Sequence, residues 1–416
     1  MLRFLTDAAA GANQSLLILC VLIDVLVPAF CAHAAENQPA GRSVIEYLGT
    51  AEISGDSVDL SGLSDQLENG EPHNRLGGIS ALEYTGKGSL YIALPDRGPD
   101  DGATGYACRF HLLDITVSPG HQEPVVAVLK QTNFFVDPMG RKFSGSSAVL
   151  DATSALAGRL DPEGCRHSAD GTIYVSDEYG PHLLAFDMQG REIRRYGLPD
   201  HLMVAHRSAS KDDEIARNLT GRASNRGMEG LAISPDQTRL YGIMQSSLLQ
   251  DAVKKRSGKV HGQYARIVEV DIASGAVREF AYPMADVSYG VSEILACGPG
   301  QFLVLERDSE PGTDAAFRQL VWIDLKDAVD ISSEEKLPAD HLPAGIRPVS
   351  RRPFLDFLSP DFPLAGPAMP EKIEGITFGP ALSDGRQLLL VSVDNDFEAA
   401  RPTLIWAFAF DPSLLN

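Results

Sequence analysis

The stretch DPEGCRHSADGTIYVSDEYGP, residues 161–181, has a Glu-Gly pair just before a strand and an Asp-Glu pair directly after the next one. The segment between the two strands, Ser-Ala-Asp-Gly, suits a tight turn, because Gly accepts positive φ and Asp bonds to nearby backbone. The run Thr-Ile-Tyr-Val-Ser is rich in β-branched and aromatic residues, which is typical of a strand. The stretch therefore predicts a β-hairpin with carboxylates at its ends.

The same pattern occurs at four other places along the chain. Each copy opens with a short strand, passes through a turn rich in Gly, Pro, Asp and Ser, and continues into a second apolar strand. The five copies begin at Leu76, Asp161, Arg226, Gly290 and Lys372. Third and fourth strands follow some of these hairpins, as in residues 182–198 and 266–283. Four strands per repeat is the composition of a propeller blade, so the sequence predicts an all-β propeller.

The number of blades depends on the two ends of the chain. Five blades are visible directly, and residues 43–60 and 403–410 supply further strands. Pairing the ends would close the ring and remove open sheet edges, which otherwise invite aggregation. We therefore expect six blades, with seven as the alternative, in a ring closed by the N- and C-terminal strands. A two-sheet β-sandwich would not explain why a Glu-Gly pair precedes the same hairpin.

The N-terminus carries a predicted export signal. Residues 15–30 form an apolar run, and Ala32-His33-Ala34 follows as a small-x-small cleavage site. A membrane anchor is the alternative, but the run is short for a span and Asp24 interrupts it. We expect residues 1–34 to be a signal peptide and residues 35–416 to be a single domain. The mature protein is then periplasmic or secreted, with no membrane span.

Charge and cysteine content restrict the partners. Asp and Glu number 56 against 36 Lys and Arg, which gives a formal net charge of −20. Such a field repels nucleic acid and suits divalent cations, so we expect a small-molecule partner and no nucleic acid. The cysteines after residue 34 are Cys108, Cys165 and Cys297. A Cys108–Cys165 bridge is one interpretation, and three small buried apolar side chains is the other.

Glutamates repeat at one place in the predicted hairpins. The innermost strand of each blade lines the central channel of a propeller, so equivalent residues point to one axis. Ser80 holds this place in the first repeat, and the glutamates of the other four are Glu163, Glu229, Glu293 and Glu374. Converging carboxylates repel one another, and a hard cation would relieve that repulsion. We predict that these glutamates bind a metal, with calcium favoured because no His or Cys pattern indicates zinc.

A second acidic set ends the next strand of each hairpin, where loops would meet an entering ligand. The residues predicted to be catalytic are Asp177, Glu178, Glu306 and Asp394. Basic residues stand beside the same motifs, and those predicted to bind an anionic or ester substrate are Arg97, Arg226, Arg307 and Lys372. A metal would polarise an oxygen of the substrate, and a free carboxylate would act as general base. For strand-end aspartates such as Asp96, Asp308 and Asp396, a turn role is the alternative.

Taken together, these motifs resemble the phytase-like family, described as the esterase-like activity of phytase. The matching segments are LGGISALEY with PDRGP, DPEG with SDEYGP, MEGLAISPD with LYGIMQS, SEIL with LVLERD, and IEGI with SVDNDF. The resemblance implies an exported β-propeller-like protein with hydrolytic acids at Glu163, Asp177, Glu178, Glu229, Glu306 and Asp394. The chain departs from the pattern at Ser80, at Gln245 and at Glu293, which Ile follows in place of Gly.

Three functions are compatible with these patterns. The first is a calcium-assisted hydrolase of a phosphate or carboxylic ester. The second is a non-catalytic binding propeller that calcium stabilises, and the third is a lactonase-type propeller, by analogy of fold alone. A serine hydrolase of the α/β type is disfavoured because the sequence has no Gly-x-Ser-x-Gly motif. Phytate would need a strongly basic site, which this acidic chain would provide only with bound calcium.

Overall fold

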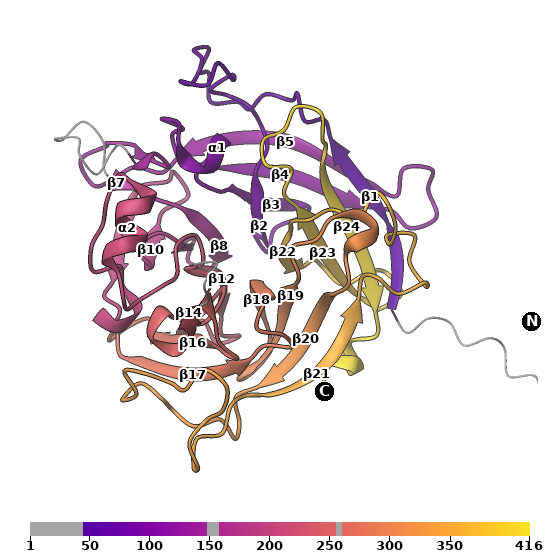
Figure 1. Ribbon diagram of the computed structural model, residues 1–416. Helices are drawn as coiled ribbons and strands as arrows, with labels where there is room; N and C mark the ends of the chain where they lie inside the picture. Colours follow the sequence, from indigo (N-terminus) through magenta and orange to yellow (C-terminus); the bar gives the residue numbers. More distant parts are fainter. Residues whose placement is uncertain (1–44, 148–157, 255–259) are drawn as a thin grey trace, which may run out of the picture. The chain divides into compact units, whose positions relative to one another are not determined.

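The computed structural model describes residues 45–147, 158–254 and 260–416. Five four-stranded antiparallel sheets surround a common axis, like the blades of a propeller (Figure 1). The innermost strands contact one another in a closed ring, in the order β2, β8, β12, β18, β22 and back to β2. The prediction of an all-β propeller is confirmed.

The strands of each blade are given from the axis outward. Blade 1 has β2 (Ile79–Tyr84), β3 (Leu90–Pro95), β4 (Arg109–Val117) and β5 (Val125–Phe134). Blade 2 has β8 (Pro162–His167), β9 (Ile173–Asp177), β10 (His182–Phe186) and β11 (Glu192–Tyr196). Blade 3 has β12 (Met228–Ile233), β13 (Arg239–Met244), β16 (Tyr264–Asp271) and β17 (Val277–Pro283). Blade 4 has β18 (Gly290–Gly298), β19 (Gln301–Arg307), β20 (Arg318–Asp324) and β21 (Ser350–Asp356). Blade 5 has β22 (Ile373–Phe378), β23 (Gln387–Val393), β24 (Thr403–Phe410) and β1 (Ile45–Ile53).

Short elements occupy the connections between these strands. The two-residue strands are β6 (Phe143–Ser144), β7 (Gly158–Arg159), β14 (Val253–Lys254) and β15 (Val260–His261). The α-helices among the described residues are α1 (Pro99–Gly102) and α2 (Lys211–Arg217). The 3₁₀ turns are η2 (Asp200–Leu202), η3 (Leu249–Asp251), η4 (Gly312–Asp314) and η5 (Pro412–Leu415).

The expectation of six blades is wrong, and so is the alternative of seven. The N-terminal strand β1 pairs antiparallel with β24, with Ile45 opposite Phe410, and becomes the outermost strand of blade 5 (Figure 1). The last repeat supplies only three strands to that blade, so β24 would otherwise leave its outer edge unpaired. The two ends of the chain therefore complete a fifth blade and do not build a sixth.

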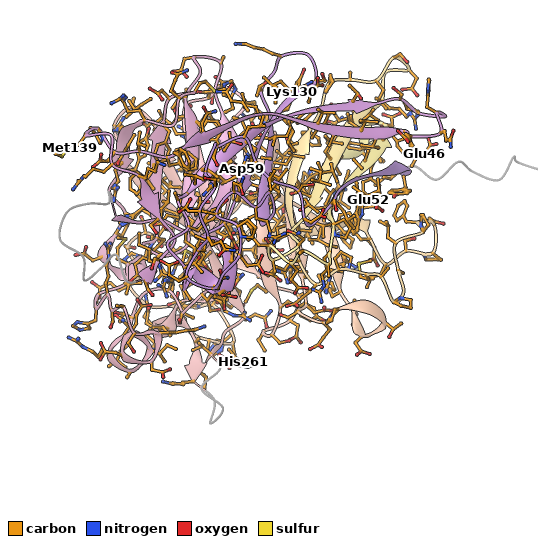
Figure 2. The ribbon with its side chains drawn as sticks, turned by 90° about the horizontal axis from the view of Figure 1, so that it is seen from above. Glu46, Glu52, Asp59, Lys130, Met139 and His261 are labelled. Carbon is orange, nitrogen blue, oxygen red and sulfur yellow. The ribbon has the colours of Figure 1, made fainter. Side chains whose placement is uncertain are left out.

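Apolar side chains fill the space between neighbouring blades. Five core clusters lie in the gaps of the ring, one in each gap, and smaller clusters lie elsewhere. In the gap between blades 3 and 4, for example, the ring of Tyr241 meets that of Phe302 edge-on at 4.7 Å between centroids. Figure 2 shows side chains filling the disc, while Met139 projects from its outside. This packing holds the innermost strands in fixed positions around the axis.

A β-bulge interrupts each innermost strand at the repeated Glu-Gly pair or its equivalent. Bulges change the direction in which a side chain points, and here they occur at the same place in all five blades. The glycine is required because the backbone of the next innermost strand approaches it closely. A Cβ on Gly230 would lie 2.6 Å from the Cα of Glu293, and one on Gly164 would lie 2.6 Å from the backbone nitrogen of Leu231.

The cysteines do not form the bridge considered from the sequence. Cys108 and Cys165 are free thiols, buried in the core between blades 1 and 2. The Cys108 thiol donates a hydrogen bond to the carbonyl oxygen of Leu160 at 3.3 Å. Burial raises the pKa of both thiols well above the ordinary value, so they act as small apolar side chains.

The predicted signal peptide, residues 1–34, lies outside the described residues and stays a prediction. In the part of the chain that the structure describes, every helix is too short or too polar to cross a membrane.

Candidate functional site

A cavity of about 270 Å³ lies where the five blades meet. Every blade contributes to its wall, and most of the lining side chains are polar or charged. They include six carboxylates, Asp96, Glu163, Glu178, Glu229, Glu371 and Glu374, and four cations, Arg97, Arg226, Arg307 and Lys372. We call this space the axial cavity. All four residues predicted to bind substrate line it, as do three of the four predicted metal ligands.

The bulge residues form one layer of this wall. Strand register makes Glu163, Glu229 and Glu374 equivalent in blades 2, 3 and 5, with Ser80 and Ser292 at the same place in blades 1 and 4. The three glutamates face the axial cavity together, although they come from segments far apart in the sequence. Their predicted role as metal ligands stays a prediction.

Glu293 does not belong to this layer, which corrects the sequence-based placement. In the strand register Glu293 stands where the other blades have Gly or Ala, and Ser292 takes the glutamate position. Its carboxylate accepts hydrogen bonds from the backbone N–H groups of Leu231, at 2.8 Å, and Ile294, at 2.9 Å. The sequence comparison matched Glu with Glu, whereas the bulge register is shifted by one residue.

A second layer comes from the residues at or just after the end of the second strand of each blade. These equivalent residues are Asp96, Glu178, Gln245, Arg307 and Asp394. All of them except Asp394 line the axial cavity. Asp394 lies directly behind the wall, where it accepts a hydrogen bond from the Lys372 ammonium at 3.2 Å. Of the four residues predicted to be catalytic, Glu178 is therefore in the wall and Asp394 supports it.

Asp177 and Glu306 face away from the axial cavity. Each stands one residue before its blade's member of the second layer, and successive side chains of a strand point to opposite faces. Asp177 accepts hydrogen bonds from the backbone N–H groups of Asp161, at 2.9 Å, and Gly180, at 3.0 Å. Glu306 accepts from the Tyr282 hydroxyl at 2.6 Å. These partners hold the two carboxylates outside the cavity wall, which corrects their expected position, and their catalytic role stays a prediction.

Three of the cations in the wall are held by carboxylates. The Arg97 guanidinium bonds to Asp161 and, at 3.1 Å, to Glu178. Arg307 donates to Glu374 at 3.1 Å and to the Ser292 hydroxyl at 3.0 Å. Lys372 bonds to Asp394 and Asp396.

Arg226 differs from the other three cations. Its guanidinium has no hydrogen-bond or ion-pair partner among the described residues, although it lines the same cavity. The residue precedes β12, and its backbone N–H is fixed by the carbonyl of Ala223 at 3.0 Å. Burial lowers its pKa, with Glu229 and Glu178 opposing that effect. Arg226 is therefore a positioned cation with its donors available to an anion.

Burial perturbs the glutamates of the wall strongly. It raises the pKa of Glu163 well above the usual range, and the neighbouring carboxylates of Glu229 and Asp161 raise it further. The pKa of Glu229 is raised in the same way, by burial first and then by Glu178 and Glu374. The Gln245 side-chain amide donates to Glu229, whereas Glu163 has no hydrogen bond to another described residue. Such a carboxyl group either keeps its proton or takes a cation.

Three carboxylates of blade 2 are arranged as a group that could bind a metal ion. Asp161, Glu163 and Glu178 each offer an oxygen, and these oxygens lie within 4.8 Å of one another. Asp161 is 1% exposed, and its Oδ1 has no hydrogen-bond partner. The sequence did not single out Asp161, because it occurs in one blade only. Its one signal was its position two residues before Glu163.

A buried cluster, which we call the channel plug, fills the axis on the far side of the bulge layer. Arg166 lies on β8, three residues beyond Glu163. Its guanidinium pairs with Glu293 at 3.0 Å and with Glu83 at 3.5 Å, and donates to the carbonyl of Ile294 at 2.8 Å. The Thr377 hydroxyl donates to Glu83 at 3.1 Å. These residues are buried, so the plug closes one end of the channel.

Comparison with known proteins identifies the family. A family model described as "Phytase-like: Esterase-like activity of phytase" matches residues 74–397, which is most of the chain. The chain belongs to the phytase-like family. An uncharacterized secreted protein of Arthroderma benhamiae is 28% identical over 342 residues, which cover 64% of this chain and 66% of the relative. The match thus spans slightly less than two thirds of that relative's length.

Solved structures give weaker likenesses to this phytase-like protein. The major allergen Mala s 1 of Malassezia sympodialis has a TM-score of 0.39 and 10% identity, over 84% of this chain and 82% of that one. A luciferin-regenerating enzyme has a TM-score of 0.37 and 10% identity, over 81% and 94%. Scores this low support no argument about the present protein.

Proposed function

We propose that this phytase-like protein is an exported hydrolase. It would cleave the ester bond of a small anionic substrate in the axial cavity, assisted by a bound divalent cation. The observation that carries the proposal is the pairing of two features in one wall. Glu163 and Glu229 are buried carboxyl groups with raised pKa values, and Arg226 is a guanidinium without a hydrogen-bond or ion-pair partner among the described residues. Perturbed acids beside a free cation in a cavity are typical of a reactive site. Membership in the phytase-like family supports ester hydrolysis.

The charge of the wall supports a divalent cation. When every group is ionised, the six lining carboxylates and four lining cations leave an excess of two negative charges. Asp161 and Asp394, directly behind the wall, increase that excess. Asp161, Glu163 and Glu178 would hold the ion, because Asp161 Oδ1 and the Glu163 carboxylate have no hydrogen bond to another residue in the part of the chain that the structure describes. Calcium is the candidate, since it takes oxygen ligands without a fixed geometry. When bound, it would supply Lewis-acid polarisation of the ester.

The residues of the chain itself would divide the remaining work. Arg226 would bind the anionic group of the substrate, because its donors are unoccupied. Glu229 would act as general acid towards the leaving oxygen, since burial and the neighbouring carboxylates of Glu178 and Glu374 raise its pKa and so favour the protonated carboxyl group. Gln245 would orient Glu229 through the hydrogen bond that it donates. Arg97 would keep Asp161 and Glu178 in place.

Location outside the cytoplasm is part of the same proposal. The Arthroderma benhamiae relative is a secreted protein, and residues 1–34 carry the predicted signal peptide. In either location, the site would take up calcium after export.

The proposal is tested with purified mature protein against p-nitrophenyl phosphate, bis-p-nitrophenyl phosphate, p-nitrophenyl acetate and a γ-lactone. Each substrate is assayed with calcium and with a chelator. We expect turnover that the chelator abolishes and that falls at least 100-fold in Glu229→Gln and in Arg226→Gln. The matched control is Glu46→Gln, on the exposed outer strand β1, which should keep full activity. Turnover that survives both cavity variants, or no turnover of any ester, would contradict the proposal.

A calcium-stabilised binding propeller is the second candidate function. The observation that favours it is that three of the four cations in the wall are held in ion pairs, as a rigid binding surface would require. It predicts no turnover in the assay above, together with a calcium-dependent rise in melting temperature that Glu163→Gln removes. The two functions therefore give opposite results in one set of measurements.

A further inference from the structure

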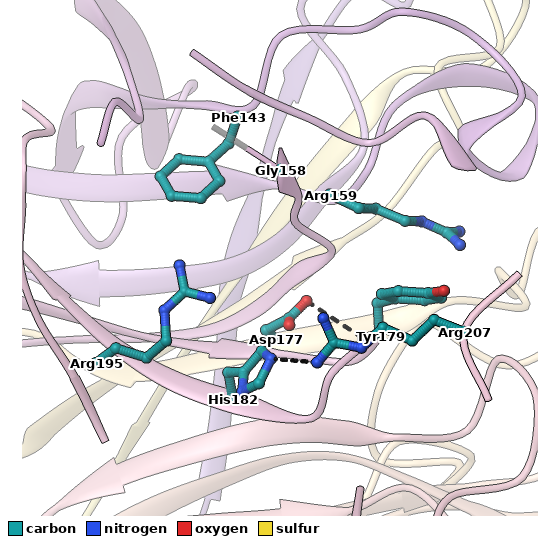
Figure 3. A pocket seen from close by; sticks show the side chains of 8 residues that line it. All are labelled: Phe143, Gly158, Arg159, Asp177, Tyr179, His182, Arg195 and Arg207. Atoms are coloured by element: carbon teal, nitrogen blue, oxygen red, sulfur yellow. Dashed lines mark hydrogen bonds between the residues drawn. The ribbon is translucent and has the colours of Figure 1, made fainter. Parts of the chain in front are cut away.

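A second cavity, of about 130 Å³, lies beside blade 2 and away from the axis. Arginines dominate its lining, with Arg159 on β7, Arg195 on β11 and Arg207 after η2 (Figure 3). His182, at the start of β10, lies between Arg195 and Arg207 in the same view. We call this space the arginine pocket. Its charge is opposite in sign to the net charge of −20 of the whole chain.

Two of these guanidiniums have no carboxylate partner among the described residues. Arg207 donates to Nε2 of His182 at 3.0 Å. Arg159 lies over the ring of Tyr179, with 3.9 Å from its guanidinium carbon to the ring centroid, and its Nε donates to the carbonyl of Gly145 at 3.2 Å. Arg195 differs, because Glu192 binds it at 3.1 Å from outside the pocket. Arg159 and Arg207 therefore bring positive charge into the pocket without a hydrogen-bonded carboxylate among the described residues.

The lining also contains one carboxylate, that of Asp177. Asp177 is 1% exposed, and its oxygens are taken by backbone N–H groups of Asp161, Tyr179 and Gly180. No ion pair joins Asp177 to a described arginine. Three converging guanidiniums repel one another, and an anion between them would relieve that repulsion.

His182 contributes a neutral hydrogen-bonding group. Burial, with Arg207 and Arg195 adding to the effect, lowers the pKa of His182 to about 3. The imidazole is therefore neutral at ordinary pH. Because its Nε2 accepts from Arg207, its proton is on Nδ1. The imidazole fixes Arg207 in place and leaves the other donors of that guanidinium available.

We propose that the arginine pocket binds a tetrahedral oxyanion, phosphate or sulfate, either free or at the end of a larger molecule. The planar fork of a guanidinium matches two oxygens of such an anion, and here several forks face one small space. The pocket has a volume of about 130 Å³, roughly half that of the axial cavity at about 270 Å³, which suits a small anionic group. The site is separate from the axial cavity and does not depend on the hydrolase proposal.

The test is isothermal titration of the mature protein with inorganic phosphate, at constant ionic strength in chloride. Arg207→Gln and Arg159→Gln should each weaken binding at least tenfold. Arg226→Gln is the matched control, because it removes the unpaired guanidinium of the axial cavity. Two saturable sites, of which Arg207→Gln removes one and Arg226→Gln the other, would also support the proposal. Loss of binding in Arg226→Gln alone, or no saturable binding, would overturn it.

A second readout follows the imidazole of His182 by NMR. A bound oxyanion should shift its ring resonances in a saturable way in the wild-type protein, and the shift should disappear in Arg207→Gln. Phenyl phosphate against inorganic phosphate distinguishes a free from a carried group, and acetate tests whether a planar carboxylate suffices. Tighter binding of phosphate or phenyl phosphate than of acetate supports the proposal. Equal binding of acetate would overturn the preference for a tetrahedral oxyanion.

Discussion

Glu163 and Glu293 are both buried glutamates on innermost strands, yet their surroundings differ completely. Glu163 belongs to the bulge layer, lines the axial cavity and has no hydrogen bond to another described residue. Glu293 belongs to the channel plug, where two backbone N–H groups and Arg166 surround its carboxylate. The difference teaches that glutamates on neighbouring innermost strands can have opposite surroundings. Glu293 is held by its partners in the plug, whereas Glu163 faces the cavity without a hydrogen bond to another described residue.

The largest expected effect comes from removing the cation of the channel plug. Arg166→Met leaves Glu83 and Glu293 buried without their ion pair, and breaking a buried pair costs about 3–5 kcal/mol of unfolding free energy. Urea denaturation at pH 7.5 measures the loss. Arg226→Met, on the cavity side, is the control and should change the free energy of unfolding by less than ~0.5 kcal/mol. Equal losses in the two variants would remove the distinction between plug and cavity.

The plug should also give the protein a pH-dependent stability. Burial raises the pKa of Glu293 from 4.5 to about 7, despite the opposing effect of Arg166. Because the pKa of Glu293 is raised in the folded state, its contribution to the unfolding free energy is fully present below pH 4.5. This contribution is lost as the pH rises through about 7. The shift corresponds to roughly 3 kcal/mol.

The measurement compares wild type with Glu293→Gln by urea denaturation at pH 5, 6, 7 and 8. The difference between the two unfolding free energies should change between pH 5 and pH 7 and level off towards pH 8. A difference that stays constant from pH 5 to pH 8 would show that Glu293 does not titrate with a raised pKa.

Substitution in the bulge layer should raise the free energy of unfolding, whereas substitution in the channel plug should lower it. In chelator at pH 7.5, Glu163→Gln should raise the unfolding free energy by about 1–2 kcal/mol, because it removes a buried carboxylate that lacks a partner. Saturating calcium should stabilise the wild type, by about 2.7 kcal/mol at a concentration 100 times the Kd, and should stabilise the variant much less. Thermal unfolding with and without calcium measures both effects. A variant destabilised in chelator would show that Glu163 is a satisfied structural residue.

The smallest expected change in stability is that of an Arg226 variant, which is compared with a variant of the paired cation Arg307. Arg226→Gln should leave the free energy of unfolding within ~0.5 kcal/mol of wild type, since its guanidinium holds no other residue. Arg307→Gln should cost about 1–3 kcal/mol, because Glu374 and Ser292 lose a donor. Urea denaturation of both variants measures the difference. An Arg226 variant as unstable as the Arg307 variant would contradict the assignment of Arg226 as a free anion contact.

Local sequence patterns predicted the blades and part of the site. The hairpin repeat depends on turn residues and alternation within about 20 residues, so it is readable without long-range information. Glu163, Glu229 and Glu374 could be brought together because equivalent residues of a ring must converge. The blade count was not predictable in this way, since it depends on the pairing of β1 with β24 across the whole chain.

The errors in the site have a shared physical cause. A one-residue shift along a strand turns a side chain to the opposite face. Glu293 was misplaced by one residue relative to the bulge, and Asp177 and Glu306 stand one residue before the positions that face the cavity. Asp161 was missed because the repeat has no equivalent acid in the other blades. Spacing identified the motifs, but only strand register decides which residue of each motif faces the axis.

Calcium titration by isothermal calorimetry tests the central claim most directly, using wild type, Glu163→Gln and Glu293→Gln after removal of bound metal. We predict one calcium per wild-type chain, binding at least tenfold weaker in Glu163→Gln and unchanged in Glu293→Gln. Binding that is the same in all three proteins, or no binding to the wild type, would contradict the claim that Glu163 and the neighbouring carboxylates of the axial cavity form the functional site.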